Sequence, residues 1–574
     1  MKIARRAAAL CCAAALLAAL CSCAAAPAAD GVGSGETRDT RPSQKADLKK
    51  LRLNDGVWQY DKAQDVYWQS GAAYCSVPRD AIHETLSVFV PGNYFHGEKN
   101  SDGTYVCSID YSAKINGYTA ATAPMLLAVN TKEYEAKTAP ASYHGTAMER
   151  CLKAGMVYVS PGLRGTGGKN PGGSPWGAVD LKAAVRFLRL NMERLPGDPD
   201  RIFAFGTDAG GALSAVLGAS GDSAAYLPYL DSVGSALYDE KGDPLSDTVC
   251  GVMCWNPFPA PDTADSAYAW LLGQYSEEGS RTGDSWTSAF SRDLASAFAD
   301  QINRMSLKDE EGNALTLEAT RNGVCTSGGY ADELRSLLGQ SLNRYLKDAK
   351  FPCAAEVAGK TVRCKTPGDY VEALNGGEHW ISYDAAAGTV RISDLGGFAR
   401  RCAGTLKEVG AFDGLERGTP ENRAFAGNDG EALHFDAVMS ALLAENQDDY
   451  TALSGWKASR PAEYAADLEK TDELGGNAEV RRNLYNPLYF LCRGDAGCGT
   501  STPAAYWRVN CGVCQNGAAV VDSMNLTLAL RENERVKKVR FAPVWTQKGT
   551  LPEDTGNGFE NFIRWIKVCC PAGA

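Results

Sequence analysis

Residues 201–214, Arg-Ile-Phe-Ala-Phe-Gly-Thr-Asp-Ala-Gly-Gly-Ala-Leu-Ser, constrain the fold of this chain more than any other stretch. The apolar run 202–205 is typical of a short, fully buried strand. Gly206 and Gly210 bound a tight turn, and the small residues after it predict a closely packed helix. Glycines suit these places because so sharp a turn leaves no room for side chains beside its central residue, Asp208.

Apolar runs and helical patterns alternate on both sides of this turn. The expected strands are 85–90, 123–129, 155–159, 250–255, 507–510 and 536–541, and the expected helices are 180–191, 518–530 and 559–568. Strands that alternate with helices predict a doubly wound, mostly parallel sheet with helices on its faces, which is an α/β fold.

The alternation stops between residues 256 and 480. This region has helical segments, polar loops and one hairpin-like stretch at 380–392. We therefore expect a core made of 51–255 and 481–574, interrupted by a large, mainly helical insertion; an unrelated second domain is the alternative. A chain of 574 residues is too long for one compact core, which agrees with this division.

The first residues are typical of an export signal. Lys2, Arg5 and Arg6 precede the apolar stretch 7–20, which is too short for a good membrane span. Leu20-Cys21-Ser22-Cys23 resembles a bacterial lipobox, which implies cleavage before Cys23 and acylation of its thiol. Simple secretion and cleavage at Cys21 are the alternatives. Residues 24–50 are expected to be a flexible tether, and the protein is expected to be lipid-anchored outside the cytoplasm.

Composition limits the partners. The net charge of −11 argues against nucleic acid or an anionic membrane surface, so membrane contact is expected only through the lipid anchor. Nineteen cysteines in an exported chain suggest disulfides, although their pairing and the oligomeric state cannot be deduced from the sequence. Cys511-Gly-Val-Cys514 has no second pair nearby, so neither a metal nor a cofactor is expected.

The strand, turn and helix at 201–214 resemble the nucleophile elbow, G-x-S-x-G, of α/β-hydrolases. Further stretches resemble, in order, the bacterial tannases of subtype B, α/β-hydrolases that cleave galloyl esters. The stretches are Asn116-Gly117-Tyr118-Thr119, Gly162-Leu163-Arg164-Gly165, Pro196-Gly197-Asp198, Ala209-Gly210-Gly211-Ala212, Ala411-Phe412-Asp413, Pro420-Glu421-Asn422, Asn486-Pro487-Leu488 and Trp507-Arg508-Val509. The resemblance implies an α/β-hydrolase fold in which the insertion forms a lid over the site.

The same resemblance implies where the catalytic triad would lie, and all of its positions differ. The nucleophilic serine falls at Asp208, the acid at Gln515 and the histidine at Gly549. The backbone N–H groups of Ala209 and Leu163 would form the oxyanion hole. Arg164 is expected to anchor the loop beside it.

Galloyl-binding positions of the family fall at Lys407, Glu421 and Gly517. Lys407 and Glu421 keep their residue types and their spacing of fourteen residues, whereas Gly517 replaces a carboxylate. The triad positions have therefore changed while two of the binding positions have not.

Elementary chemistry agrees with the loss of the triad. A serine or carboxylate nucleophile at the elbow needs a base to activate it or to release its intermediate. The five histidines are His83, His96, His144, His379 and His434, and none lies in the last 140 residues, where the fold places its base. Asp208 as a covalent nucleophile is one alternative. The other is an ionised Asp208 held by N–H groups at the helix start.

We expect a tannase-like lipoprotein without hydrolytic activity that binds phenolic or galloyl groups. An active ester hydrolase with a non-standard residue set is the first alternative. A scaffolding or adhesion protein is the second.

Overall fold

The structure is a computed structural model that describes residues 45–573 except 144, 168–171, 259, 319–324, 358, 515, 516, 518 and 546–550. Cys23 and the expected signal sequence lie outside this part. Residues 45–50 belong to the expected tether, but they already bind the folded body. The N–H groups of Lys45 and Asp47 donate to Asp231 and Ser76, and the 3₁₀ helix η1 (Leu48–Leu51) buries Leu51.

A nine-stranded sheet forms the centre of the folded part. Its order is β1 (Gln59–Asp61), β2 (Val66–Ala73), β3 (Thr85–Pro91), β9 (Val157–Pro161), β8 (Met125–Val129), β10 (Ile202–Thr207), β11 (Gly251–Trp255), β16 (Tyr506–Gly512) and β17 (Lys538–Val544). The strands from β9 to β17 pair in parallel, whereas β1, β2 and β3 form an antiparallel edge. The predicted, mostly parallel sheet is confirmed.

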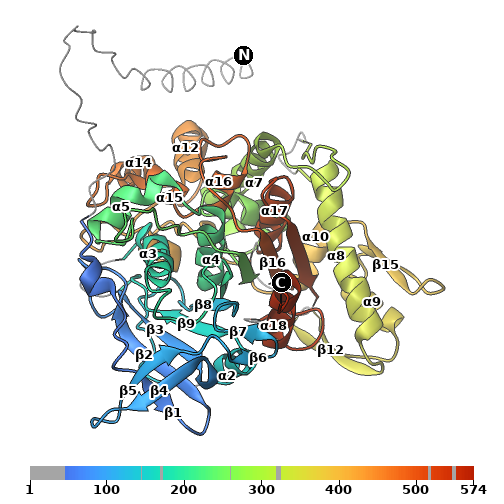
Figure 1. Cartoon of the computed structure of the whole chain (residues 1–574). Helices are drawn as coiled ribbons and strands as arrows, with labels where there is room; N and C mark the ends of the chain where they lie inside the picture. Colours follow the sequence, from blue (N-terminus) through green and yellow to red (C-terminus); the bar gives the residue numbers. More distant parts are fainter. Residues whose placement is uncertain are drawn as a thin grey trace. The chain divides into compact units, whose positions relative to one another are not determined.

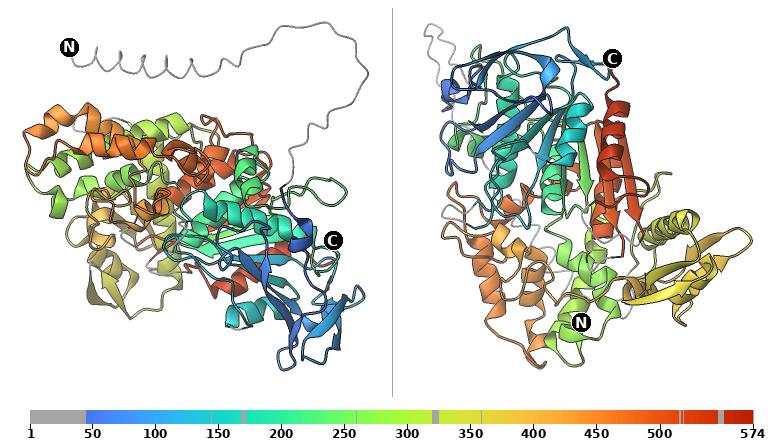
Figure 2. Two further views of the ribbon diagram at one scale, coloured as in Figure 1. Left: turned by 90° about the vertical axis from the view of Figure 1, so that its left-hand side faces the viewer. Right: turned by 90° about the horizontal axis from the view of Figure 1, so that it is seen from below.

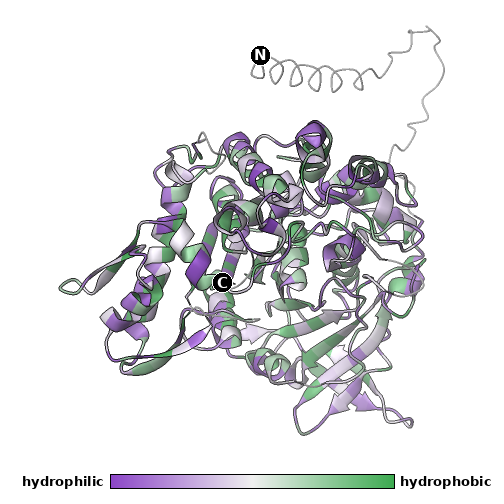
Figure 3. Cartoon of the chain, turned by 180° about the vertical axis from the view of Figure 1, so that it is seen from behind, coloured by the Kyte–Doolittle hydropathy of each residue, from purple (hydrophilic) through white to green (hydrophobic). Residues whose placement is uncertain are grey.

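Helices cover both faces of this sheet (Figure 1). On one face lie α3 (Trp176–Leu190), α4 (Ala209–Ala219) and α17 (Ala519–Arg531), and on the other lie α2 (Thr146–Lys153) and α18 (Gly558–Cys569). On the α18 face, the ring of Trp565 lies 5.5 Å from that of Phe203 on β10. Figure 3 shows the hydrophobic residues that line the central strands between these two layers.

The insertion leaves the sheet after β11 and returns at β16. These two strands are parallel neighbours, with Gly251 opposite Tyr506. The insertion lies to one side of the sheet layers (Figure 2). Its α-helices are α6 (Ala264–Leu271), α7 (Trp286–Met305), α8 (Gly329–Asp348), α9 (Pro367–Asn375), α10 (Leu395–Cys402), α11 (Pro420–Ala424), α12 (Ala437–Glu445), α13 (Gln447–Thr451), α14 (Arg460–Glu469), α15 (Ala478–Asn483) and α16 (Pro487–Leu491).

The insertion also carries two hairpins. The one predicted at 380–392 is confirmed as β14 (Ile381–Asp384) and β15 (Thr389–Ile392). The other, β12 (Cys353–Val357) with β13 (Lys360–Cys364), was missed by the sequence analysis. Most side chains of this second hairpin are not buried, so its strands lack a clear apolar alternation.

The remaining elements are short. They are β4 (Phe95–Lys99), β5 (Tyr105–Ile109), β6 (Lys114–Ile115), β7 (Tyr118–Thr119), α5 (Leu227–Ser232), η2 (Gly92–Tyr94), η3 (Ala224–Tyr226), η4 (Gly273–Tyr275) and η5 (Gly279–Arg281). No helix in the described ranges is both long enough and apolar enough to span a membrane.

A buried ion pair fixes the loop after β9. The guanidinium of Arg164 donates to the carboxylate of Asp180 on α3, and both side chains are almost fully buried. The Arg164 N–H donates to the same carboxylate at 2.8 Å. The expected role of Arg164 as a loop anchor is confirmed.

Candidate functional site

The turn at 206–210 has the backbone geometry of a nucleophile elbow. Asp208 lies between β10 and α4 with φ of 49° and ψ of −117°, a conformation that few side chains adopt. A Cβ atom on Gly210 would lie 2.2 Å from the carbonyl oxygen of Val129 on β8. One on Gly206 would lie 2.4 Å from the backbone of Gly210. Both glycines are therefore required by close backbone contacts.

The carboxylate of Asp208 is exposed at the tip of this turn. The Thr207 hydroxyl donates to it at 2.9 Å, and the Asp208 N–H donates to the carbonyl of Trp255 at 2.9 Å. The part of the carboxyl group that faces the protein loses hydration, which raises the pKa of Asp208, while the Thr207 hydrogen bond opposes this shift. No described lysine, arginine or histidine forms an ion pair with this carboxylate.

The two expected oxyanion-hole donors differ in their hydrogen bonding. The N–H of Ala209 opens α4 and has no acceptor among the described residues. The N–H of Leu163 donates to the carbonyl of Lys137 at 2.7 Å, and Lys137 donates back to Leu163 at 2.9 Å. In this conformation only the Ala209 donor is open to a ligand.

Lys407 and Glu421 come from one segment of the insertion. Lys407 precedes a loop that leads to the short helix α11, which carries Glu421. The Lys407 ammonium lies 4.1 Å from the centroid of the Phe412 ring, which stacks on Phe258 with centroids 4.1 Å apart. Glu421 and Lys407 attract each other, and both side chains are half-buried. The fold therefore brings an ammonium, a carboxylate and two stacked aromatic rings together.

Burial and charge act in opposite directions on Glu421. Burial raises the pKa of its carboxyl group, while the nearby Lys407 ammonium lowers it. Negative charge from Glu133 adds to the rise. A half-buried carboxylate near an ammonium is a strong acceptor for hydroxyl donors.

Tyr134 lies within electrostatic reach of both the elbow and residues 407–422, which we call the wall. The pKa of its phenol is raised well above the usual value, first by burial and then by the charges of Glu421, Tyr485 and Asp208. The carboxylates of Glu421 and Asp208 thus both act on one phenol. Glu133 and Tyr134 have φ of 52° and 61°, so this ring is presented from a strained turn. Neither periodicity nor a motif marks Tyr134, and the sequence analysis did not identify it.

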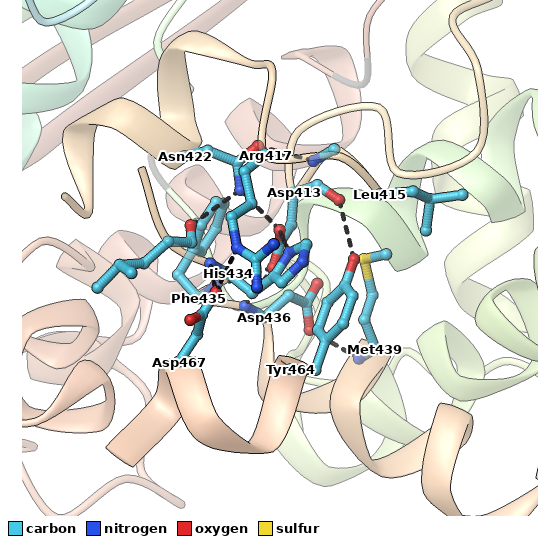
Figure 4. A network of polar contacts seen from close by, with 12 residues as sticks. Asp413, Leu415, Arg417, Asn422, His434, Phe435, Asp436, Met439, Tyr464 and Asp467 are labelled. Carbon is cyan, nitrogen blue, oxygen red and sulfur yellow. Dashed lines mark hydrogen bonds and ion pairs between the residues drawn. The ribbon is translucent and has the colours of Figure 1, made fainter. Parts of the chain in front are cut away.

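A buried network holds the wall in place (Figure 4). The Asp413 carboxylate accepts hydrogen bonds from the Asn422 amide at 2.7 Å and from the Phe435 and Asp436 N–H groups at 2.8 Å. His434 lies 2.6 Å from the same carboxylate through Nδ1. Asn422 is the neighbour of Glu421 on α11, so this network fixes the helix that carries Glu421.

The described histidines lie away from Asp208. His434 is buried in the network of Asp413, where its ring stacks on Tyr464 with centroids 3.5 Å apart. His83 and His96 lie beside Asp80 and Asp110, and His379 is exposed. The side chain that bonds to the Asp208 carboxylate in the described part is the Thr207 hydroxyl, which is not an ordinary base near neutral pH.

Two of the predicted triad positions, Gln515 and Gly549, lie outside the described residues. Gly517 is described and half-buried, and no atom lies within 4 Å of the place where its Cβ would be. That position has no side chain to bind a ligand. No set of three or more His, Cys, Asp or Glu side chains in the described ranges could hold a metal ion.

Two cavities adjoin the site residues. One of about 450 Å³ runs beside Thr207 and is lined by Asn130, Lys132 and Lys137. Another of about 730 Å³ lies in the insertion and reaches Lys407, with Tyr275 and Arg281 on its walls. Either volume suits a small organic molecule.

Comparisons with known proteins agree with this geometry. A profile of the BD-FAE family matches residues 129–243, the part that contains the elbow. The tannin acyl hydrolase from Lactobacillus plantarum has 25% identity and a TM-score of 0.66, over 91% of this chain and 99% of that one. The tannase from Fusobacterium nucleatum has 22% identity and a TM-score of 0.67, over 91% and 99%. A tannin acyl hydrolase in complex with ethyl gallate has 24% identity and a TM-score of 0.65, over 91% and 99%.

The chain has a tannase-like α/β-hydrolase fold. A comparison with curated protein sequences found no match. The expected fold class, with its large helical insertion, is confirmed. Within this tannase-like fold, Asp208 lies at the elbow, and Lys407 and Glu421 lie together in the insertion.

Proposed function

We propose that this protein binds small phenolic or galloyl compounds in its tannase-like site and does not hydrolyse them. The observation that carries the proposal is the Lys407 ammonium, which lies 4.1 Å from the Phe412 ring of the Phe258 stack and is attracted by the Glu421 carboxylate. At the elbow, the side chain that bonds to the Asp208 carboxylate in the described part is the Thr207 hydroxyl, which is not a base.

The chemistry of the wall suits phenols. The Lys407 ammonium donates hydrogen bonds to phenolic oxygens, and the Glu421 carboxylate accepts them from phenolic O–H groups. The ring of such a ligand has the Phe412 and Phe258 rings nearby for apolar contact. The complexes of tannin acyl hydrolase with ethyl gallate and with 3,4-dihydroxybenzoate support this class of ligand for a protein of the same fold.

The elbow suits binding better than hydrolysis. Hydrolysis through an elbow needs a nucleophile, a base within hydrogen-bond reach and a group that orients the base. In the sequence these positions carry Asp208, Gln515 and Gly549, which supply neither an imidazole nor a carboxylate to orient one. Loss of the complete unit costs about a million-fold in turnover in enzymes of this type.

The location of the protein forms part of the proposal. The basic residues, the apolar stretch and Leu20-Cys21-Ser22-Cys23 support export and attachment of a lipid to Cys23. Cys23→Ser is expected to abolish incorporation of labelled fatty acid. Persistent labelling of that variant would contradict the proposed attachment site.

Titration of methyl gallate against the wild type, Lys407→Ala and Lys62→Ala tests the binding proposal. Lys62 is an exposed lysine in the β1–β2 turn, so its variant controls for loss of one positive charge. We expect saturable binding by the wild type and Lys62→Ala, and about tenfold weaker binding by Lys407→Ala.

The other outcomes separate the alternatives. Hydrolysis at tannase-like rates that Asp208→Ala abolishes would favour an active esterase with a non-standard residue set. Absence of binding to all three proteins would favour a scaffolding or adhesion role. Equal binding to all three would place the ligand away from Lys407.

A further inference from the structure

Three cysteines gather at the end of the sheet that lies opposite the elbow. Cys250 directly precedes β11, and Cys569 and Cys570 end helix α18, close to the C-terminus in Figure 1. The sulfur atoms of Cys250 and Cys570 are 3.9 Å apart although the residues are 320 positions apart in the chain. The fold alone therefore brings these two thiols into contact.

The backbones on both sides of this contact are held firmly. The Cys250 N–H donates to the carbonyl of Ile202 at 2.7 Å, and its own carbonyl accepts from Tyr506 at 3.2 Å. The Cys570 N–H donates to Ile566 at 2.8 Å, and the Tyr118 hydroxyl donates to the Cys570 carbonyl at 2.7 Å. Side-chain rotation is thus the motion that brings the two sulfurs together.

The surroundings distinguish Cys570 from its neighbours. The hydrogen bond from the Cys250 thiol lowers the pKa of Cys570, and the Arg201 and Lys537 charges add to this; burial and Asp198 oppose it. By contrast, burial raises the pKa of Cys569 to about 12. Cys570 is therefore the thiol of this cluster that most readily becomes a thiolate, with Cys250 placed to resolve it.

We propose that Cys250 and Cys570 are a redox-active pair that closes to an intrachain disulfide by exchange with a small disulfide such as oxidised glutathione. The Cys570 thiolate attacks one sulfur of the small disulfide, whose S–S bond breaks and releases one thiolate. Cys250 then loses its proton and attacks the Cys570 sulfur, releasing the second small thiolate. Both small thiolates take up the protons of the two cysteines, so two protein thiols are oxidised and one small disulfide is reduced.

The disulfide would fasten α18 to β11 without entering the candidate ligand site. Cys250 precedes the amino end of β11, whereas Asp208 binds Trp255 at its carboxyl end. A strand of this length spans roughly 16 Å. The linkage closes a very long loop, so it restricts the unfolded chain strongly. It would thus stabilise the fold and leave binding at Lys407 unchanged.

The test treats the full chain with oxidised glutathione, blocks the remaining thiols with N-ethylmaleimide and maps the peptides by mass spectrometry. Cys569→Ser is the matched control, because it removes the adjacent thiol and leaves the pair intact. We expect a Cys250–Cys570 linkage in the wild type and in Cys569→Ser. Cys250→Ser is expected to keep glutathione attached to Cys570, because the resolving thiol is missing.

A second readout measures thermal unfolding of the oxidised and reduced wild type. Oxidation is expected to raise the midpoint by roughly 5 °C, and Cys250→Ser is expected to remove the shift. Recovery of both Cys250 and Cys570 blocked by maleimide after oxidation would overturn the proposal. A disulfide that joins Cys250 or Cys570 to Cys569 would also overturn it. So would one that joins either of them to Cys353 or Cys364, which face each other across the β12–β13 hairpin.

Discussion

The elbow and the wall, residues 407–422, contribute different features to the candidate site. The elbow has the backbone of a hydrolase: a sharp turn at Asp208, obligatory glycines and an open N–H at Ala209. The wall presents the charged side chains of Lys407 and Glu421, and a buried network around Asp413 fixes the helix that carries Glu421. Backbone geometry and chemical function are therefore separable, and the wall carries the function that we propose.

The largest expected effect is the loss of stability when the buried network around Asp413 is broken. Asp413→Ala would leave the Asn422 amide, the His434 ring and two backbone N–H groups without their buried acceptor. We expect a loss of about 3–5 kcal/mol in the free energy of unfolding, measured by chemical denaturation. Glu431→Gln is the control, because Glu431 is exposed in the loop after α11. We expect it to change the free energy of unfolding by less than about 0.5 kcal/mol. Equal stability of the two variants would show that the network does not hold the wall.

A substitution at the elbow is expected to lower the free energy of unfolding by less, and through a steric collision. A methyl group at Gly210 would collide with the Val129 carbonyl of β8. Gly210→Ala is therefore expected to cost about 1–3 kcal/mol of unfolding free energy. At Gly517 a methyl group meets no atom within 4 Å, so Gly517→Ala serves as the control and should cost far less. A neutral Gly210→Ala would show that the tight elbow is not needed by the fold.

The pH dependence of ligand binding separates the contribution of Glu421 from that of Asp208. The Glu421 carboxyl has a raised pKa, so it gains a proton at a higher pH than an ordinary glutamate does. Protonation removes its charge and an acceptor site, so affinity for methyl gallate is expected to fall on acidification, starting above the usual glutamate range. Glu421→Gln is expected to flatten this profile. Asp208→Asn is expected to retain it, and a flat profile in that variant would assign the titration to the elbow.

The smallest expected effect is at the elbow nucleophile itself. Asp208→Ser places a serine at the elbow, but the sequence has glycine at 549 and glutamine at 515, where the resemblance would require a histidine and an acid. We expect no measurable hydrolysis of methyl gallate by this variant in a spectrophotometric assay. Turnover by Asp208→Ser would reveal a base that the family positions do not predict.

The sequence predicts the elements with strong local signals and misses those made by long-range contacts. The turn at 206–210, the parallel strands and the terminal helix are predicted because apolar runs and glycines mark them. Tyr134 is not predicted, because only the folded chain brings its turn to Glu421 and Asp208. The same holds for Cys250 and Cys570, whose contact depends on the packing of α18 against the sheet.

The buried network around Asp413 was likewise not predictable from the sequence. The sequence shows Asp413 as part of a family stretch and His434 as an isolated histidine. Their contact of 2.6 Å follows from the path of the loop after α11, for which no local pattern gives a signal.

The central claim is that this site binds phenolic esters without cleaving them. Isothermal titration calorimetry of methyl gallate into the wild-type protein tests both parts at once, because binding gives a transient heat and turnover gives sustained heat. We predict transient heats that saturate and return to baseline after every injection. Sustained heat that persists until the ester is consumed would contradict the claim, and so would the absence of any binding heat at two temperatures.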